Sequence, residues 1–154
     1  MAIVILKANI HHSQIIWEWR NDPSTISMSI TNKAISWAEH EKWYKSNLNE
    51  KGIKTYIAKE NNTYLGVVRF EQLKLDENIY EISINLAPKE RGKGLGKIIL
   101  KNSIDCFLKD QLNYKVIKAN IKSENIQSIK TFLKCGFEFF GENNKIITLI
   151  LQKN

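Results

Sequence analysis

Apolar residues recur along the chain with two different spacings, one typical of strands and one typical of helices. Short apolar runs and every-second-residue patterns predict strands over residues 3–6, 55–59, 64–73, 79–86, 116–121, 137–140 and 146–151. Apolar residues three or four apart predict helices over residues 12–22, 36–49, 92–112 and 125–134. We expect Pro23 to end the first helix, and Ser36 with Glu39 to form a capping box that begins the second.

The order of these elements indicates one domain of mixed architecture. Three consecutive strands favour an antiparallel meander, whereas the strand-helix-strand unit over residues 79–121 favours a parallel pair. The expected fold class is therefore α/β (α+β), with a mixed, mostly antiparallel sheet and helices on both faces. A length of 154 residues with 43% hydrophobic residues suits one core, so we expect residues 1–154 to form a single domain.

Composition argues against several classes of function. No apolar run approaches the ~20 residues of a membrane span, and the N-terminus has no export signal, so we expect no membrane partner and a cytoplasmic location. The two cysteines and three histidines lack the spacing of a metal site. The net charge of +7 comes from 20 lysines and 3 arginines interleaved with acids, which indicates a solvated surface rather than nucleic-acid binding.

The densest chemical signal is a basic, glycine-rich segment, residues 85–97, that leads from a strand into the long helix. Its glycines would let the backbone approach an anion, and the first amides of the helix would point at that anion along the positive end of the dipole. Gly96-Lys97 is followed by Ile98 rather than by Ser or Thr, so the segment is not a Walker A loop. Its evenly spaced glycines do not match the dinucleotide-binding fingerprint either.

The run Arg91-Gly92-Lys93-Gly94-Leu95-Gly96 has the form Arg-x-x-Gly-x-Gly and resembles the loop with which the GNAT acetyltransferase superfamily grips the diphosphate of acetyl-CoA. The segment from Asn125 to Phe137 is similar to the family's helix whose asparagine contacts the cofactor arm. The resemblance implies the GNAT fold, acetyl-CoA as co-substrate and no metal. It assigns cofactor binding to Asn85, Leu86, Arg91, Gly92, Lys93, Gly94, Leu95, Gly96, Lys97, Asn125, Ser128 and Phe132.

Acetyl transfer also needs groups that take a proton from the amine and stabilise the carbonyl oxygen. Glu81, Ser83 and Asn85 share one face of the strand before the loop, where they border a water-filled cleft or simply meet solvent. We take Glu81 as the candidate base and Ser83 as its helper, and the resemblance implies that the main chain around Asn85 and Leu86 holds the carbonyl oxygen. By the resemblance, Phe132 stands where many family members have a tyrosine that acts as general acid, and Asn120 stands where many have a glutamate that acts as general base. Neither residue can do that work here, so a mechanism that relies on positioning alone stays open.

The first half of the chain suggests the acceptor. Residues 17–22, 35–44, 66–70 and 80–84 resemble segments of the GNAT enzymes that acetylate a nucleotide-linked amino sugar in pseudaminic acid synthesis for flagellin glycans. By that resemblance the acceptor is a small molecule with a primary amine, namely the 4-amino group of a UDP-linked amino-deoxy sugar. The same resemblance assigns substrate binding to Arg20, His40 and Arg69.

Two other functions stay open at this point. Acetyltransferases of the ribosomal-protein type, which act on protein N-termini, share the loop and a similar pair of helices. A non-catalytic binder of acyl-CoA or of nucleic acid would explain the missing acid and base. The aromatic residues of the first half could equally be core packing. The sequence allows a homodimer without requiring one.

Overall fold

The computed structural model describes residues 2–111 and 113–153 of the chain. Leu112, the last residue of the predicted 92–112 helix, lies outside the described residues. In chain order the elements are β1 (Val4–Lys7), the 3₁₀ turn η1 (Ile10–His12), α1 (Ser13–Arg20), α2 (Pro23–Met28), α3 (Trp37–Leu48), β2 (Ile53–Glu60), β3 (Thr63–Gln72), β4 (Ile79–Leu86), the 3₁₀ turn η2 (Pro88–Glu90), α4 (Leu95–Asp110), β5 (Val116–Lys122), α5 (Ile126–Lys134), β6 (Glu138–Asn143) and β7 (Ile146–Gln152).

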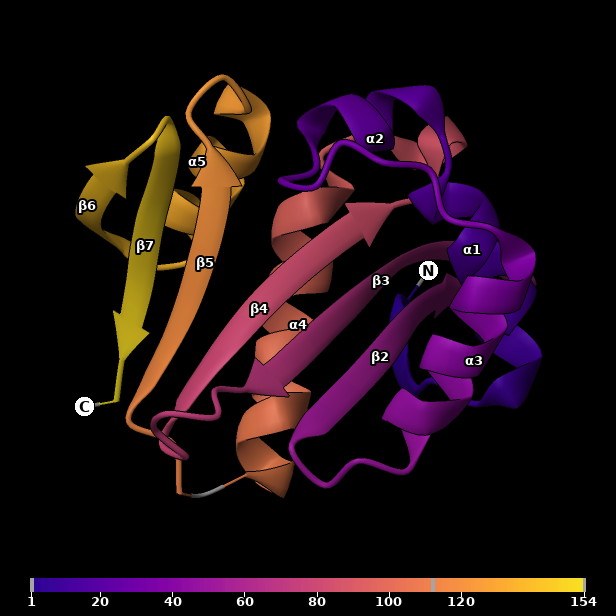
Figure 1. The fold of residues 1–154 in the computed structure, drawn as a ribbon, viewed down its shortest axis with the longest axis horizontal. Coiled ribbons are helices and arrows are strands. Elements are labelled where there is room, and N and C mark those ends of the chain that lie inside the picture. The colour runs from indigo at the N-terminus through magenta and orange to yellow at the C-terminus, as the bar shows by residue number, and fades with distance from the viewer. Residues whose placement is uncertain (1, 112, 154) are drawn as a thin grey trace.

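Within the described residues, seven strands form one sheet in the order β1-β2-β3-β4-β5-β7-β6. Neighbouring strands are antiparallel except β4 and β5, which are parallel. This parallel ladder ends at Glu81 and Lys118, although β4 continues to Leu86 and β5 to Lys122. The two strands therefore separate toward their carboxyl ends (Figure 1). Over residues 82–86, β4 is paired with β3 on one side and lacks a strand partner on the other.

Helices cover both faces of the sheet, and each face has its own apolar core (Figure 1). On one face α4 and α5 bury the larger core, in which the rings of Phe70 and Phe107 stack with their centroids 4.1 Å apart. On the other face, α1 and α3 pack Trp19 and Tyr44 against Ile57 of β2. The prediction of a mixed, mostly antiparallel sheet between two helical layers is confirmed.

The predicted helix over residues 12–22 is present as α1, and a second, short helix that was not predicted follows it. The first, α1, ends at Arg20, and Pro23 is the first residue of α2 rather than only a stop signal. Proline suits this position because the first helical N–H has no partner within the helix. The side chain of Asp22 caps α2 by accepting from the N–H of Thr25 at 3.4 Å. None of the six residues of α2 is buried, so the sequence carries no apolar period there.

None of the helices in residues 2–111 and 113–153 is long and apolar enough to cross a bilayer. In the same part of the chain, no three His, Cys, Asp or Glu side chains gather in a way that could hold a metal ion.

Candidate active site

The glycine-rich segment forms the turn between β4 and α4. Gly92 and Gly94 have φ angles of +77° and +75°, and a Cβ at either would meet no atom within 4 Å. The left-handed backbone, and not crowding, therefore requires glycine at both positions, and the helix begins at Leu95, directly after them. At Gly96, by contrast, a Cβ would lie 3.3 Å from Cγ2 of Thr131, so this glycine lets α4 approach α5.

The amino-terminal end of α4 is suited to an anion. No side chain in the described part of the chain caps it, and its first turn contains no acidic residue. Lys97 in that turn is exposed, and Lys93 lies just before it, paired with Glu90 at 3.2 Å between Nζ and Oε2. A lysine in the first turn opposes the helix dipole unless an anion neutralises both. The amides of the loop and first turn, with these two lysines, fit the diphosphate of acetyl-CoA.

The guanidinium of Arg91 is engaged elsewhere. It forms an ion pair with Asp22 at 2.9 Å between Nη1 and Oδ2, and it donates to the carbonyl oxygen of Leu86 at 3.1 Å. Its side chain therefore connects the start of α2 with the end of β4. Arg91 was expected to bind the cofactor mostly through the backbone of the loop, and these bonds occupy the terminal nitrogens of its side chain.

The second predicted cofactor motif lies at the start of α5. Oδ1 of Asn125 caps this helix by accepting from the N–H of Ser128 at 3.3 Å, so its amide nitrogen takes no part in the cap. Phe132 was expected among the cofactor contacts, and the structure corrects that prediction. Its side chain is 2% exposed and packs edge to face on Phe137, with the ring centroids 5.0 Å apart. An apolar ring on the inner side of α5 gains more from the core than from the site surface.

The polar face of β4 meets a cavity over part of its length. Ser83 and Asn85 line this cavity, near the carboxyl end of the strand. Glu81 lies on the same face, opposite Glu71 of β3 and Lys118 of β5, where the parallel ladder ends, and it does not line the cavity. The candidate helper Ser83 and the stretch around Asn85, which is expected to hold the carbonyl oxygen, thus lie together at the cavity. The candidate base Glu81 lies two residues before Ser83, outside the cavity.

The cavity has a volume of about 260 Å³ and lies between the helices of one layer and the middle of the sheet. Its wall combines side chains from α1, α2, α3, β2, β3 and β4. The residues that line it are Ile16, Arg20, Thr25, Trp43, Tyr44, Asn47, Leu48, Thr55, Val67, Arg69, Ser83, Ile84 and Asn85.

Two of the three predicted acceptor residues, Arg20 and Arg69, line this cavity and contact the indole of Trp43. Their Cζ atoms lie 4.8 Å and 5.0 Å from its ring centroid. Arg69 donates to Oε1 of Glu71 at 3.1 Å and to Oδ1 of Asn47 at 2.7 Å. Each arginine keeps one buried donor without a hydrogen-bond partner in the described residues, Nη1 of Arg20 and Nε of Arg69. Burial, together with the charge of Arg69, lowers the pKa of Arg20. Both observations favour an anionic ligand beside Arg20.

The third predicted acceptor residue, His40, lies outside the cavity, which corrects the prediction. Its side chain is 0% exposed, and Nε2 lies 2.9 Å from the carbonyl oxygen of Ser13 in α1. Its ring stacks on that of Tyr44, with the centroids 5.5 Å apart. Burial lowers the pKa of His40, so the imidazole is neutral at pH 7. His40 joins α3 to α1 and does not reach a ligand.

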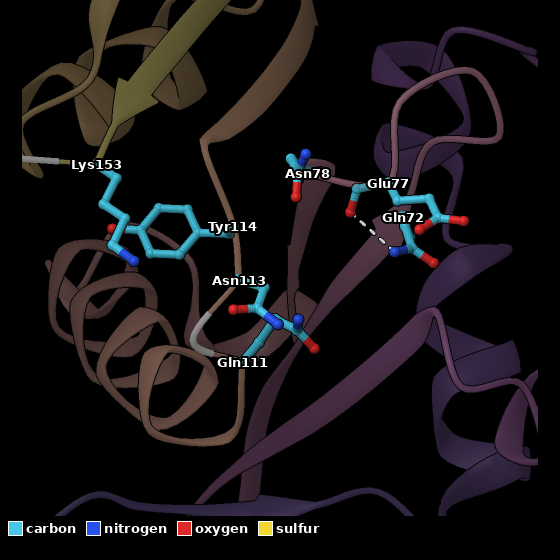
Figure 2. A pocket seen from close by; sticks show the side chains of 7 residues that line it. All are labelled: Gln72, Glu77, Asn78, Gln111, Asn113, Tyr114 and Lys153. Atoms are coloured by element: carbon cyan, nitrogen blue, oxygen red, sulfur yellow. Dashed lines mark hydrogen bonds between the residues drawn. The ribbon is translucent and has the colours of Figure 1, made fainter.

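A larger hollow, of about 440 Å³, lies at the other end of the sheet (Figure 2). It is located where β4 begins and α4 ends. The eight residues of β4 extend roughly 25 Å, so this hollow is remote from the glycine-rich turn at the strand's carboxyl end. The smaller cavity, which meets the carboxyl end of β4, is therefore the candidate site. The hollow is lined by Gln72, Glu77, Asn78, Gln111, Asn113, Tyr114 and Lys153.

Sequence reasoning did not assign five polar or aromatic members of the cavity wall to the site, namely Thr25, Trp43, Tyr44, Asn47 and Thr55. Trp43 and Asn47 lie four residues apart on α3, so their shared helix face was a usable signal. Thr25 had no such signal, because the short helix that carries it has no apolar pattern.

Comparison with known proteins identifies the family. The pattern of the family described as acetyltransferase (GNAT) domain matches residues 3–138. The chain is 22% identical to acetyltransferase PseH of Campylobacter jejuni over 146 residues, which cover 95% of this chain and 89% of that protein. It is 30% identical over 142 residues to the uncharacterized protein MJ1062 of Methanocaldococcus jannaschii, and these cover 88% of this chain but only 28% of that longer protein.

The fold points the same way. The crystal structure of spermidine N-acetyltransferase from Vibrio cholerae, in complex with CoA and spermine, superposes with a TM-score of 0.85 at 17% identity, covering 97% of this chain and 95% of that one. The family match and the fold agree with the amide-rich helix end that suits a coenzyme diphosphate. The chain belongs to the GNAT acetyltransferase family and is an acetyl-CoA-dependent N-acetyltransferase that acts on amines.

Proposed function

We propose that the acceptor is the 4-amino group of a UDP-linked amino-deoxy sugar. The observation that carries this proposal is the charge of the 260 Å³ cavity, whose lining contains Arg20 and Arg69 and no Asp or Glu. Glu71, outside the lining, pairs with Arg69 at 3.1 Å, so the unmatched positive charge is that of Arg20. A polycation such as spermine would be repelled there, whereas a diphosphate would be attracted. The likeness of the first-half segments to amino-sugar acetyltransferases supports the same acceptor class. A cavity of this size holds the sugar and part of the diphosphate, so the uracil ring of the nucleotide would lie outside it.

Arg20 is the residue that most needs the anion. Its buried Nη1 has no hydrogen-bond partner in the described residues, and the neighbouring guanidinium of Arg69 repels it. A phosphate beside Arg20 would satisfy the donor and neutralise the repulsion through a charge-assisted, two-pronged hydrogen bond. Such bonds contribute about 1.5–3 kcal/mol, which corresponds to roughly a ten- to hundredfold change in affinity.

The chain's own residues supply positioning and proton transfer. Acetyl-CoA, when bound, supplies the acetyl group as a thioester and would leave as the free thiol, which takes up the proton that the amine gives up. Ser83 and Asn85 would orient the amine, and the main chain of β4 beyond the end of the ladder would hold the carbonyl oxygen. Glu81 lies two residues before Ser83 on the same face, roughly 7 Å along the strand, so it would take the proton through a water molecule. A sugar amine flanked by oxygens is less basic than lysine, so a weak base suffices.

Release of free thiol from acetyl-CoA tests the proposal directly. The purified chain is assayed with UDP-linked 4-amino sugars, with peptides that have free N-termini, and with spermine. We expect turnover of the nucleotide sugar and none of spermine. Turnover of peptides or spermine, without any response to the nucleotide sugars, would refute the proposed acceptor.

A pair of variants tests the role of the arginine. Arg20→Gln should raise the KM of the nucleotide sugar roughly tenfold or more and leave the KM of acetyl-CoA unchanged. Lys42→Gln is the control, because Lys42 is an exposed cation on α3 that does not line the cavity. An unchanged acceptor KM in Arg20→Gln would contradict the assignment of the cavity.

A further inference from the structure

The side chain of Arg91 links two segments that are far apart in the chain. On the side of α2, it bonds to Oδ2 of Asp22 at 2.9 Å and to the hydroxyl oxygen of Thr25. On the side of β4, it donates to Oδ1 of Asn85 at 3.2 Å and to the carbonyl oxygen of Leu86 at 3.1 Å. One guanidinium thus holds the start of α2 against the end of the strand that borders the cavity.

These bonds leave no terminal N–H of Arg91 for a phosphate. Each of its two Nη atoms carries two N–H groups, and the second bond of Nη1, to Oγ of Ser24 at 2.7 Å, completes their use. The charge is also matched, and the guanidinium holds the pKa of Asp22 below its usual value. The terminal N–H groups of Arg91 are therefore not available to a diphosphate, whereas the main-chain amides of the loop, Lys93 and Lys97 can bind one.

Polar contacts hold α2 in place. None of its residues is buried, so it contributes little apolar packing. Near its end, Nζ of Lys122 in β5 donates to the carbonyl oxygen of Ser27 at 2.9 Å and to the side chain of Asn32. The hydroxyl of Thr25 donates to Oδ1 of Asn85 at 3.3 Å. This short helix therefore bridges β4 and β5 at the end where the two strands have separated (Figure 1).

We propose that Arg91 is a positioning residue that holds α2 on the end of β4, and so fixes Thr25 and Asn85 in the wall of the 260 Å³ cavity. The inference rests on the proposed function only in taking that cavity as the acceptor site. Arg91 belongs to the loop that binds the acetyl donor, whereas α2 covers the acceptor side. Loss of the link impairs use of the acceptor and leaves the affinity for acetyl-CoA nearly unchanged.

Two substitutions break the link from opposite sides. Arg91→Lys keeps the positive charge but loses the planar fork that reaches several acceptors at once. Asp22→Asn keeps a residue that caps α2 well but removes the negative charge. Lys45→Gln is the matched control, because it breaks an exposed ion pair with Glu41 on α3, at 2.6 Å between Nζ and Oε1, that touches neither segment.

Hydrogen-deuterium exchange measures the link without any acceptor. Amides of residues 22–35 exchange faster in Arg91→Lys and in Asp22→Asn than in the unmodified chain, whereas Lys45→Gln leaves them unchanged. Because no acceptor is present, this readout separates failure of the inference from failure of the proposed function. Unchanged exchange over residues 22–35 in both link variants would overturn the inference.

Kinetics and calorimetry then distinguish positioning from phosphate binding. With the nucleotide sugar as acceptor, Arg91→Lys and Asp22→Asn each lower kcat/KM roughly tenfold. The double variant is no more impaired than the worse of the two single variants, because both break the same link. The Kd of acetyl-CoA changes by less than about twofold in each variant. If Arg91→Lys weakened acetyl-CoA binding as much as Lys97→Gln does, Arg91 would be a phosphate-binding residue, and that result would overturn the inference. Faster exchange without turnover of any nucleotide sugar supports the link and refutes the proposed acceptor.

Discussion

Replacement of Gly94 by alanine tests why the turn before α4 needs glycine. Gly94 has φ +75° and ψ +14°, in the left-handed region, and an added Cβ would meet no atom within 4 Å. The cost is therefore that of the backbone alone, about 1–2 kcal/mol for a residue other than glycine. In a chain of this size each 1 kcal/mol lowers the melting temperature by about 2–4 °C, so Gly94→Ala should lower it by about 2–8 °C.

Gly141 in β6 provides the matched control. A Cβ there would also meet open space, but its φ is not in the left-handed region. Gly141→Ala should therefore change the free energy of unfolding by no more than about 0.5 kcal/mol. Gly94→Asn should be more stable than Gly94→Ala, because asparagine adopts the left-handed conformation more readily.

Thermal unfolding followed by circular dichroism measures the three variants. Calorimetry with acetyl-CoA then asks whether the loop still presents its amides, and Gly94→Ala should bind more weakly than Gly141→Ala. Equal melting temperatures for the two alanine variants would refute the reasoning, as would a lower melting temperature for Gly94→Asn than for Gly94→Ala.

Other predictions concern helix packing, pH and the candidate base. Gly96→Ala places a Cβ 3.3 Å from Cγ2 of Thr131 and should cost about 1–3 kcal/mol, and Thr131→Ser, which removes that carbon, should restore part of the loss. If the losses in unfolding free energy of Gly96→Ala and Thr131→Ser, measured in urea, simply added in the double variant, a clash between residue 96 and Thr131 would be excluded. Burial holds the pKa of His40 below its usual value of 6.5, so on acidification the unfolded state takes up a proton that the folded state resists. Stability should therefore fall as the pH drops below about 6.5, and His40→Gln, which keeps a donor without titrating, should weaken that dependence. If the free energy of unfolding of His40→Gln depended on pH as steeply as that of the unmodified chain, groups other than His40 would cause the dependence. Glu81→Gln should lower kcat several-fold at neutral pH with little change in the KM of acetyl-CoA, and unchanged rates across pH would remove Glu81 from the mechanism.

The strands could be predicted from the sequence because the local pattern that marks them is also what the core requires. The predicted strand over residues 79–86 coincides with β4, whose Tyr80 and Ile82 point into the larger core. Helix α2 could not be predicted in this way. Its contacts with Arg91 and Lys122 come from distant parts of the chain, and the sequence around Pro23 holds no trace of them.

The candidate site divides along the same line. The turn before α4 is local, so its glycines and lysines could be recognised as one unit. The cavity is assembled from separate elements, and no local pattern states that Arg20 of α1 and Arg69 of β3 meet at Trp43 of α3. The prediction for His40 fails for the same reason. Whether His40 faces the core or the cavity depends on which face of α3 packs against α1, and the sequence does not specify that face.

Binding of acetyl-CoA to the amino-terminal end of α4 is the central claim, and isothermal titration calorimetry tests it most directly. The purified chain is titrated with acetyl-CoA and, separately, with acetyl-pantetheine, which carries the same thioester but no diphosphate. Acetyl-CoA should bind saturably and at least roughly tenfold more tightly than acetyl-pantetheine, and Lys97→Gln should narrow that difference. Absence of binding heat with acetyl-CoA, or equal affinity for the two thioesters, would contradict the account.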